Sequence, residues 1–435
     1  MRILFISKEL IGGSVLQALI SEGNDVKVYI ENIDWKSCLD GIAHKIDAWE
    51  PELSWVGKSG LIVFDDVGWN NTQDVLRREG YSVFGGNMES DALELNRQHF
   101  QDVLSASGVK ILPSYDFTTA EEAITFVNEQ PGIWVVKQNS HIGMLNYVGQ
   151  RDDSKDVIDV LEMYKEKNIS PVHLQKRARG YEMGVARYFN GSDWVGPIEV
   201  NLEYKSLCNG DIGPLTAEMG TVMWYDTNEE MLLYKSTLAK LKDYLAKINY
   251  KGDIDINCIV NAEGAWPLEA TMRFGTPSTE LQCDLHKSPW SDFLKAIADG
   301  KQYSLDYHSG YGIVVSVATP PFPYAPEVFG ESRTGTSMNN RILFTEDLTE
   351  REQSQIRFME VSATISKTGQ KQFHLAGEHG YALYVTGLGE SISQAKEEAY
   401  TVVRKIIIPR MFYRTDIGDT FINGGMETIK NWGWI

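Results

Sequence analysis

The first 88 residues alternate between apolar runs and helix-like segments, in the order that a parallel β-sheet requires. Short apolar runs, each with the length of a buried strand, occur at residues 3–6, 26–30, 61–64 and 81–84. A loop with Gly12 and Gly13 separates the first run from a periodic segment at 15–20, which together give a βαβ unit. This part of the chain is therefore predicted to form a small doubly wound α/β domain, with ligands beyond the carboxyl ends of its strands.

The pattern changes after this region. One long helix is predicted at 90–106, a further helix begins at Thr118 and Thr119, and others are predicted near 153–165, 229–248 and 391–406. Short strand candidates lie between them, at 134–137, 172–174, 313–318 and 382–387. The predicted fold class is therefore α/β and α+β, and a length of 435 residues indicates several domains.

The charge balance narrows the class of ligand. With 41 Lys and Arg against 60 Asp and Glu, the chain has a formal net charge of -19, which repels a nucleic-acid backbone. No apolar run approaches the roughly 18 to 20 residues that span a bilayer, and the first 30 residues lack a cleavage pattern. The four cysteines, Cys38, Cys208, Cys258 and Cys283, lie far apart without C-x-x-C spacing. We expect a cytoplasmic protein with no membrane or nucleic-acid partner.

A predicted hairpin at 253–274 carries the most informative polar pattern. Alternation places one polar row on each strand: Asp253, Asp255 and Asn257 on the first, and Glu269, Thr271 and Arg273 on the second. If the loop has an odd length or the hairpin a bulge, Asn257 lies opposite Glu269 and both rows line one cleft. Oxygen ligands there suit a hard cation that bridges phosphates, and Arg273 would neutralise phosphoryl charge. Taken alone, the hairpin is more typical of a solvated sheet face.

Two further features are weak by themselves. Lys137 ends an apolar strand, where a lysine is more often a snorkelling edge residue than a ligand. Glu182 follows the basic, Gly-containing segment 175–180, which is typical of a turn with surface charges. Only their combination with the hairpin points to a binding site.

In their order along the chain, these features resemble the ATP-grasp ligases, and within them the phosphoribosylamine–glycine ligase family. Each motif is short, but their order and spacing agree over nearly the whole length. The segments that carry the resemblance are 93–100 (LELNRQHF), 113–123 leading to 135–137 (VVK), 180–182 (GYE), Lys205, 209–214 (NGDIGP), 219–220, 250–252, 268–275 (LEATMRFG), Pro277, 385–389 (VTGLG), 394–395 and 414–418 (RTDIG).

The resemblance implies an ATP-grasp fold in three parts. An N-terminal doubly wound domain would cover residues 1–110, a nucleotide-binding domain of two α+β lobes 111–310, and a small C-terminal α+β domain 311–435. It also implies ATP and Mg²⁺ or Mn²⁺ as cofactors. The partners would be small molecules, an amino acid such as glycine and an amine, and the protein would be a monomer or a homodimer.

The resemblance assigns the nucleotide to one set of residues. Arg97 and Lys137 would contact phosphates, and Glu182 would accept hydrogen bonds from the ribose hydroxyls. Ser140 and His141 belong to the loop that covers the phosphates, although His141 is equally well read as a plain loop residue. The segment that reads adenine corresponds to Gln175, Lys176, Arg177 and Ala178.

The resemblance assigns the metal and the reacting groups to a second set of residues. Glu269 would bind magnesium, with Asn257 and Thr271 as further ligands, and Asp255 is available to compensate for a thin set. The residues implied near the transferred phosphoryl group and the amino acid are Arg273, Lys205 and Asp211.

Several segments depart from the family pattern. The first loop, 12–16, lacks the family's Arg, Glu and His, and the loop after 138 contains a single glycine. Thr271 stands where the family has Asn. Asp65 and Asp66 replace the Gly-Pro-Glu loop that helps to hold phosphoribosylamine, and two acids would repel a ribose phosphate. We therefore expect a different acceptor amine.

The implied reaction is amide formation through an acyl phosphate, with ADP and phosphate as products. ATP phosphorylates the carboxylate and supplies a leaving group, so the protein's tasks are alignment and charge stabilisation. Two alternatives stay open at this point. One is the purine-pathway ligase itself, and the other is a non-catalytic module that binds or senses ATP.

Overall fold

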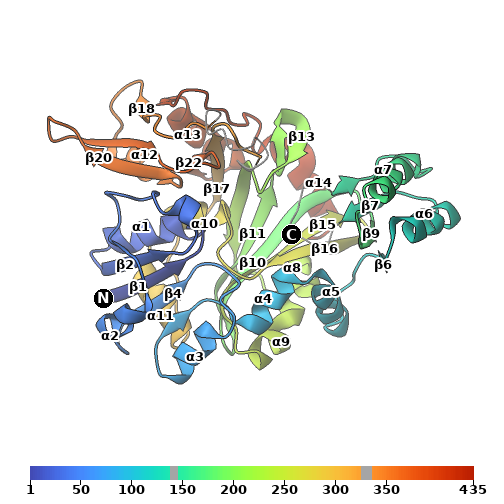
Figure 1. Cartoon of the computed structure of the whole chain (residues 1–435), viewed down its shortest axis with the longest axis horizontal. Coiled ribbons are helices and arrows are strands. Elements are labelled where there is room, and N and C mark those ends of the chain that lie inside the picture. The colour runs from blue at the N-terminus through green and yellow to red at the C-terminus, as the bar shows by residue number, and fades with distance from the viewer. Residues whose placement is uncertain (138–145, 325–335) are drawn as a thin grey trace.

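The N-terminal region forms a five-stranded parallel sheet in the computed structural model, which describes residues 1–137, 146–324 and 336–435 (Figure 1). The strand order is β3-β2-β1-β4-β5. Its elements are β1 (Arg2–Ser7), α1 (Gly13–Ser21), β2 (Asp25–Ile30), β3 (Lys45–Ile46), α2 (Leu53–Val56), β4 (Leu61–Phe64), α3 (Thr72–Arg78) and β5 (Val83–Phe84). Because β1 and β4 are buried on both faces, they read as continuous apolar runs. The predicted doubly wound sheet is confirmed.

The helix predicted at 90–106 is instead two helices. α4 (Met88–Leu95) and α5 (Arg97–Ala106) are separated by Asn96, whose backbone is extended at φ -126° and ψ 99°. The Asn96 side chain accepts a hydrogen bond from the His99 backbone N–H and so caps α5. The prediction was wrong because apolar periodicity continues through a residue that prefers a cap to a helix interior.

A small lobe projects at one end of the molecule (Figure 1). Its antiparallel sheet has the order β6-β9-β7-β8, and two helices pack on one face of it around Trp134 and Val136. The elements are β6 (Ser114–Phe117), α6 (Ala120–Glu129), β7 (Trp134–Lys137), β8 (Tyr147–Val148), α7 (Lys155–Glu166) and β9 (Val172–Lys176). Thr119 caps α6 in a capping box with Glu122, close to the predicted start of that helix.

An eight-stranded sheet forms the centre of the molecule, in the order β16-β15-β10-β11-β14-β17-β22-β19. Its strands are β10 (Tyr181–Asn190), β11 (Trp194–Glu203), β14 (Gly220–Asp226), β15 (Lys251–Asn261), β16 (Gly264–Thr271), β17 (Tyr311–Ala318), β19 (Ile356–Phe358) and β22 (Tyr381–Gly389). A short hairpin, β12 (Ser206–Cys208) and β13 (Ile212–Leu215), leaves it after β11. Since β17 pairs with β14, the sheet runs across residue 310, the predicted start of the third domain.

Helices and short ribbons complete the structure. The segment predicted as one helix at 229–248 is broken at Thr237 into α8 (Leu232–Ser236), a 3₁₀ turn (Leu238–Leu241) and α9 (Lys242–Lys247). The other elements are α10 (Ser278–Leu285), α11 (Trp290–Ala298), β18 (Leu343–Phe344), α12 (Glu350–Ser354), β20 (Val361–Ile365), β21 (Lys371–Leu375), α13 (Ile392–Val403), β23 (Ile406–Ile407) and α14 (Met426–Asn431). Within the described ranges, no helix is long and apolar enough to cross a bilayer.

The predicted hairpin is β15 and β16, and its register is the one that the polar pattern requires. Asn257 pairs with Glu269, and Asp255 pairs with Thr271. A register shift between Asn257 and Cys258 marks the bulge that brings the two polar rows together. The expected common face is thus confirmed at the level of strand pairing.

Candidate active site

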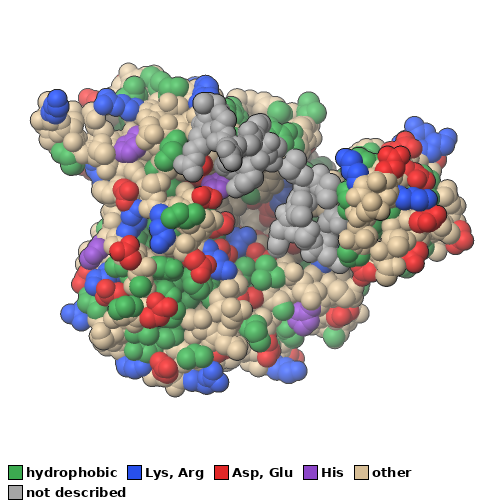
Figure 2. Space-filling view, in the orientation of Figure 1, with side chains coloured by type: hydrophobic (Ala, Val, Ile, Leu, Met, Phe, Trp, Pro, Cys, Tyr) green, Lys and Arg blue, Asp and Glu red, His purple; other side chains and the backbone are tan. Residues whose placement is uncertain are grey.

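The predicted site residues meet where the small lobe faces the central sheet. Lys137 and Gln175, on the antiparallel strands β7 and β9, lie on one side, and β10, β11, β15 and β16 contribute polar side chains on the other. The start of α5 lies nearby, because Arg97 is close enough to Lys137 to perturb it electrostatically. The space-filling view shows a hollow on this side of the molecule, between the projecting lobe and the main body (Figure 2).

Lys137 is held in place at the end of β7. Its ammonium donates a hydrogen bond of 2.6 Å to Oε1 of Gln175, a buried residue on β9. Burial, with Arg97 and Lys205 as neighbouring cations, lowers the pKa of Lys137 to about 7. An anionic ligand bound at Lys137 would stabilise the charged form of this lysine.

Lys205 lies at the centre of an acidic cluster. Its Nζ is 2.7 Å from Glu269 Oε1, 3.1 Å from Glu203 Oε2 and 3.2 Å from Glu182 Oε1. Although burial opposes the charge, these three carboxylates raise the pKa of Lys205 well above its usual value. Lys205 in turn lowers the pKa of Glu269 to about 2. Lys205 and Glu269 are therefore both charged. Through its three carboxylate partners, Lys205 connects β10, β11 and β16.

Asn257 contacts two of these carboxylates, those of Glu182 and Glu203. Its Nδ2 donates to Glu182 Oε1 at 2.9 Å and to Glu203 Oε2 at 2.8 Å. Its Oδ1 is buried and has no hydrogen-bond partner among the described residues. Burial raises the pKa of Glu203 to about 8. Two groups of this cluster thus lack a full set of partners: burial disfavours the ionised form of Glu203, and Asn257 Oδ1 accepts no hydrogen bond from the described residues.

The residues expected to hold magnesium fit a metal that is shared with phosphate. Glu269 offers an ionised carboxylate, about half exposed, and Asn257 Oδ1 is the buried oxygen that lacks a partner. Thr271 lies two residues beyond Glu269, on the same face of β16. In the described part of the chain, no three His, Cys, Asp or Glu side chains are placed to hold a metal by themselves.

A buried polar row continues from this cluster along the central sheet. Asn201 donates to both Glu199 and Asp255, and Gln282 on α10 donates to Glu199 Oε2 at 2.7 Å. Burial, with Asp253 as its nearest like charge, raises the pKa of Glu199 to about 8. The row therefore retains protons at neutral pH and connects the site to α10.

Arg273 connects this site to the parallel sheet. Its Nε lies 3.0 Å from Glu94 Oε1 on α4 and 3.5 Å from Asp66 Oδ1, and Nη1 donates to its neighbour's carbonyl, Phe274 O. Despite burial, Glu94 and Asp66 raise the pKa of Arg273, and Glu269 adds to this effect. The guanidinium thus lies between the Glu269 cluster and the carboxyl end of β4.

The segment 175–178, which the resemblance predicts to read adenine and which we call the adenine-reading segment, is only partly directed at the site. Gln175 faces Lys137, whereas Lys176 lies over the Trp134 ring at 5.1 Å, on the helix-covered face of the small lobe. Arg177 donates to Gly149 O at 2.8 Å and to the side chain of residue 150, so it also turns away. Ala178 is half-buried and lies beyond the end of β9. The backbone N–H groups of Lys176 and Arg177 donate to Pro113 O and Ile133 O, so they are already engaged.

Asp211, another predicted site residue, lies apart from the cluster. The Asp211 carboxylate is bound by Arg414 Nη1 at 2.8 Å, so it is paired with the C-terminal region and not with the Lys205 cluster. Ser140 and His141 lie outside the described residues.

The sequence interpretation missed several members of the site. Glu203 was not singled out, although the alternating segment Glu199-Val-Asn-Leu-Glu203 places its polar residues on one face. Glu94 and Asp91 were also missed, because a helix surface rich in acids is usually solvated. No local signal shows that α4 is packed against Arg273.

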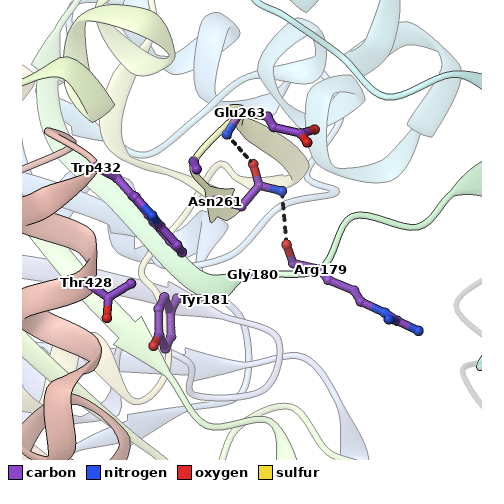
Figure 3. A pocket seen from close by; sticks show the side chains of 8 residues that line it. Arg179, Gly180, Tyr181, Asn261, Glu263, Thr428 and Trp432 are labelled. Atoms are coloured by element: carbon purple, nitrogen blue, oxygen red, sulfur yellow. Dashed lines mark hydrogen bonds between the residues drawn. The ribbon is translucent and has the colours of Figure 1, made fainter.

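A surface groove of about 510 Å³ lies beside the adenine-reading segment (Figure 3). It is lined by Tyr181 at the start of β10 and by Trp432 after α14. Asn261 fixes its floor by donating to Arg179 O at 3.0 Å and accepting from the Glu263 backbone N–H at 2.9 Å. None of the residues of the Lys205 cluster lines this groove.

Known structures share this arrangement of sheets. Phosphoribosylamine–glycine ligase from Thermotoga maritima superimposes with a TM-score of 0.68 and 20% identity, over 96% of this chain and 100% of that one. This chain has the ATP-grasp fold. A biotin carboxylase from Campylobacter jejuni, determined with an ATP analogue, shares the ATP-grasp architecture at a TM-score of 0.60 and 12% identity, over 99% of this chain and 96% of that chain.

Sequence comparison gives relatives of one name for this ATP-grasp chain. Phosphoribosylamine–glycine ligase from Fusobacterium nucleatum is 25% identical over 422 residues, 92% of this chain and 91% of the relative. The enzyme of that name from Corynebacterium ammoniagenes is 24% identical over 389 residues, 86% of this chain and 84% of the relative. No protein-family model matches the chain. The resemblance predicted from the sequence is confirmed.

Proposed function

We propose that the protein is an ATP-dependent carboxylate–amine ligase, which forms an amide bond through an acyl phosphate and releases ADP and phosphate. One observation carries this proposal. Lys137, Glu182 and Glu269, from three separate strands, lie close together with Lys205 and Arg273, in a chain that resembles phosphoribosylamine–glycine ligases. The resemblance would give these residues the family's nucleotide, metal and phosphoryl roles.

The chain's own residues would align the reactants. Lys137 and Arg97 would bind the phosphates of ATP, and the bound anion would favour the charged form of Lys137. Glu182 would accept hydrogen bonds from the ribose hydroxyls. Arg273 would stabilise the charge of the phosphoryl group during its transfer to the carboxylate of an amino acid, glycine in the first instance.

Magnesium or manganese would be bound by Glu269 and Asn257, with Thr271 beside them, together with ATP phosphates. The metal would supply charge neutralisation of the phosphates during transfer. Lys205 would then contribute by holding Glu269 ionised and oriented at 2.7 Å, and by balancing Glu182 and Glu203. No side chain is needed as a nucleophile.

Other features of the proposal concern the whole chain. We propose functional units at 1–110, 111–310 and 311–435, a cytoplasmic location, and an acceptor amine that differs from phosphoribosylamine. The last point is supported by Asp65 and Asp66, because the structure leaves both carboxylates at the carboxyl end of β4.

The ligase proposal is tested by trapping the acyl phosphate. The purified protein is incubated with ATP, Mg²⁺, hydroxylamine and single amino acids, starting with glycine, and both ADP and the amino-acid hydroxamate are measured. We expect equal amounts of ADP and hydroxamate with at least one amino acid. ATP binding without ADP or hydroxamate from any amino acid would contradict the proposal and favour a non-catalytic ATP-binding protein.

A matched pair of variants identifies the metal ligand. Glu269→Gln should lower the rate of hydroxamate formation by at least about 100-fold, as expected for loss of an electrostatic contact to the transferred group. Glu263→Gln, an exposed acid in the turn of the same hairpin, should leave the rate unchanged. Equal rates for both variants would refute the role of Glu269.

A further inference from the structure

A second charged cluster lies at the carboxyl edge of the parallel sheet, and we call it the acidic edge. Its members are Asp65 and Asp66 after β4, Asp91 and Glu94 on α4, and the cations Lys8 and Arg273. The edge is at the switch point of the sheet, since β1 leads to β2 on one side while β4 leads to β5 on the other. Ligands of open α/β sheets bind at such a point.

Asp65 is fully buried there with one oxygen satisfied. Oδ2 accepts hydrogen bonds from Ser7 Oγ at 2.9 Å and from the Gly12 backbone N–H at 2.8 Å. Oδ1 has no hydrogen-bond partner in the described part of the chain. Two donors thus fix the carboxylate and leave its second oxygen for another donor.

Asp91 repeats this arrangement from α4. It is 4% exposed, Oδ2 accepts from the Gly68 backbone N–H at 2.7 Å, and Oδ1 lacks a partner among the residues described. Gln73, a fully buried amide on α3, likewise has no partner for either side-chain atom. It lies one turn before Arg77, which bonds the Gly86 carbonyl beyond the end of β5, so Gln73 is at the same end of the sheet.

The charges at the edge do not balance. Four acids face two cations, and both cations are already engaged: Lys8 donates to Gly68 O at 3.0 Å, and Arg273 is shared by Asp66 and Glu94. Burial, with Asp66 nearby, raises the pKa of Asp65 to about 8. Burial, with Glu94 nearby, raises the pKa of Asp91 to about 6. Burial is the largest cause of both shifts, and a cation bound beside these carboxyl groups would favour their ionised forms.

We infer that the acidic edge binds the acceptor amine as a cation, and that the acceptor is an aliphatic diamine or polyamine without a phosphate group. One ammonium group is held by the buried carboxylates, whose free oxygens match its N–H donors. Asp66 and Glu94, with 13% and 12% of their side chains exposed, form the open side. This inference rests on the proposed ligase function and names its third substrate.

The placement suits the reaction. Arg273 contacts the acidic edge on one side and is influenced by Glu269 on the other, so a bound diamine lies next to the phosphoryl group. The second amino group of the diamine, in its neutral form, forms the new C–N bond with its lone pair. The C–O bond to phosphate breaks, phosphate leaves with the bonding electrons, and it takes up the proton that the amine loses. The ammonium at the acidic edge is unchanged.

Binding is measured first, without turnover. Isothermal titration of the full chain with 1,4-diaminobutane, 1-aminobutane and ribose 5-phosphate compares a dication, a monocation and an anion. We expect the diamine to bind at least tenfold more tightly than the monoamine, and ribose 5-phosphate not to bind. Asp91→Asn should weaken diamine binding at least tenfold, whereas Glu89→Gln, an exposed acid on the same helix, should not. Equal binding of diamine and monoamine, or preferred binding of ribose 5-phosphate, would overturn the inference.

Turnover separates this inference from the ligase proposal. Hydroxylamine trapping reports the acyl phosphate without the acceptor, so it tests the ligase function alone. If hydroxamate forms and the diamine is not converted to an amide of the expected mass, the inference is overturned and the ligase function stands. If the diamine binds through Asp91 but no amino acid gives hydroxamate, the ligase function and the acceptor role are both refuted. Hydroxamate together with diamine amide supports both.

Discussion

The pKa of Lys137 predicts that ATP binding takes up a proton. Lys137 is half-buried at the end of β7, accompanied by Arg97, Lys205 and His173, with Glu269 and Glu182 as the opposing acids. Burial is the largest cause of its pKa of about 7. A bound triphosphate supplies the missing negative charge and should return this pKa towards the ordinary lysine value of about 10.4.

The magnitude follows from these two values. With a pKa of about 7, Lys137 is about 10% protonated at pH 8 and about 90% protonated at pH 6. ATP binding should therefore take up about 0.9 proton at pH 8 and about 0.1 at pH 6. Above pH 7 the wild-type affinity for ATP should fall, towards tenfold per pH unit, because the proton must be acquired on binding.

Titration calorimetry in buffers of different ionisation enthalpy measures this uptake. Lys137→Met should remove it and should weaken ATP binding at pH 6 by about 10- to 150-fold, the worth of one charge-assisted hydrogen bond at roughly 1.5–3 kcal/mol. Lys155→Met, an exposed lysine at the start of α7 in the same lobe, serves as the control. Equal proton uptake by the wild type and Lys137→Met at pH 8 would refute the reasoning.

Two further predictions concern stability. Glu280 is buried, and its Oε1 accepts a hydrogen bond from Ser14 Oγ at 3.1 Å. Burial raises the pKa of Glu280 to about 7, so the folded state binds more protons than the unfolded chain between pH 4.5 and 7. The free energy of unfolding should therefore fall as pH rises through this range. Urea unfolding should show a loss of about 2–3 kcal/mol between pH 5 and 8 that Glu280→Gln lacks, and parallel curves for both proteins would contradict it. A Cβ at Gly184 would lie 2.1 Å from Asn201 Oδ1, so Gly184→Ala should cost about 1–3 kcal/mol in urea unfolding. Gly13→Ala in α1, where the nearest atom is 3.8 Å away, should cost nothing; equal stability of the two variants would count against the packing argument.

Local patterns predicted the elements that are buried or sharply capped. The four-residue run 61–64 is β4 itself, because a strand buried between layers has few polar positions to blur its limits. The run 134–137 is β7, in which buried and half-buried residues alternate. The polar rows of the hairpin predicted the pairing of Asn257 with Glu269, together with its bulge. The helices failed where one residue had a second option: Asn96 caps α5, and Thr237 bonds back to the Leu233 carbonyl.

The candidate site was predicted in part for a similar reason. Strand alternation fixes which face a residue occupies, so Asn257 and Glu269 were found from the pattern. The family resemblance supplied Lys137 and Glu182. Lys176 shows the limit of this approach, since the resemblance placed it with Gln175 although adjacent residues of a strand point to opposite faces.

The sequence by itself determined the strands, their polar faces and the excess of acidic residues, because these depend on neighbours along the chain. Only the tertiary structure decided which charges meet. Lys205 reaches Glu182 and Glu269 from positions 23 and 64 residues away, as the strand order of the central sheet requires. The same packing buries Asp65 near Arg273 and Asp91 near Glu94, each with one oxygen that lacks a partner among the described residues. Because burial disfavours an ionised carboxylate, the folded arrangement raises the pKa of both groups.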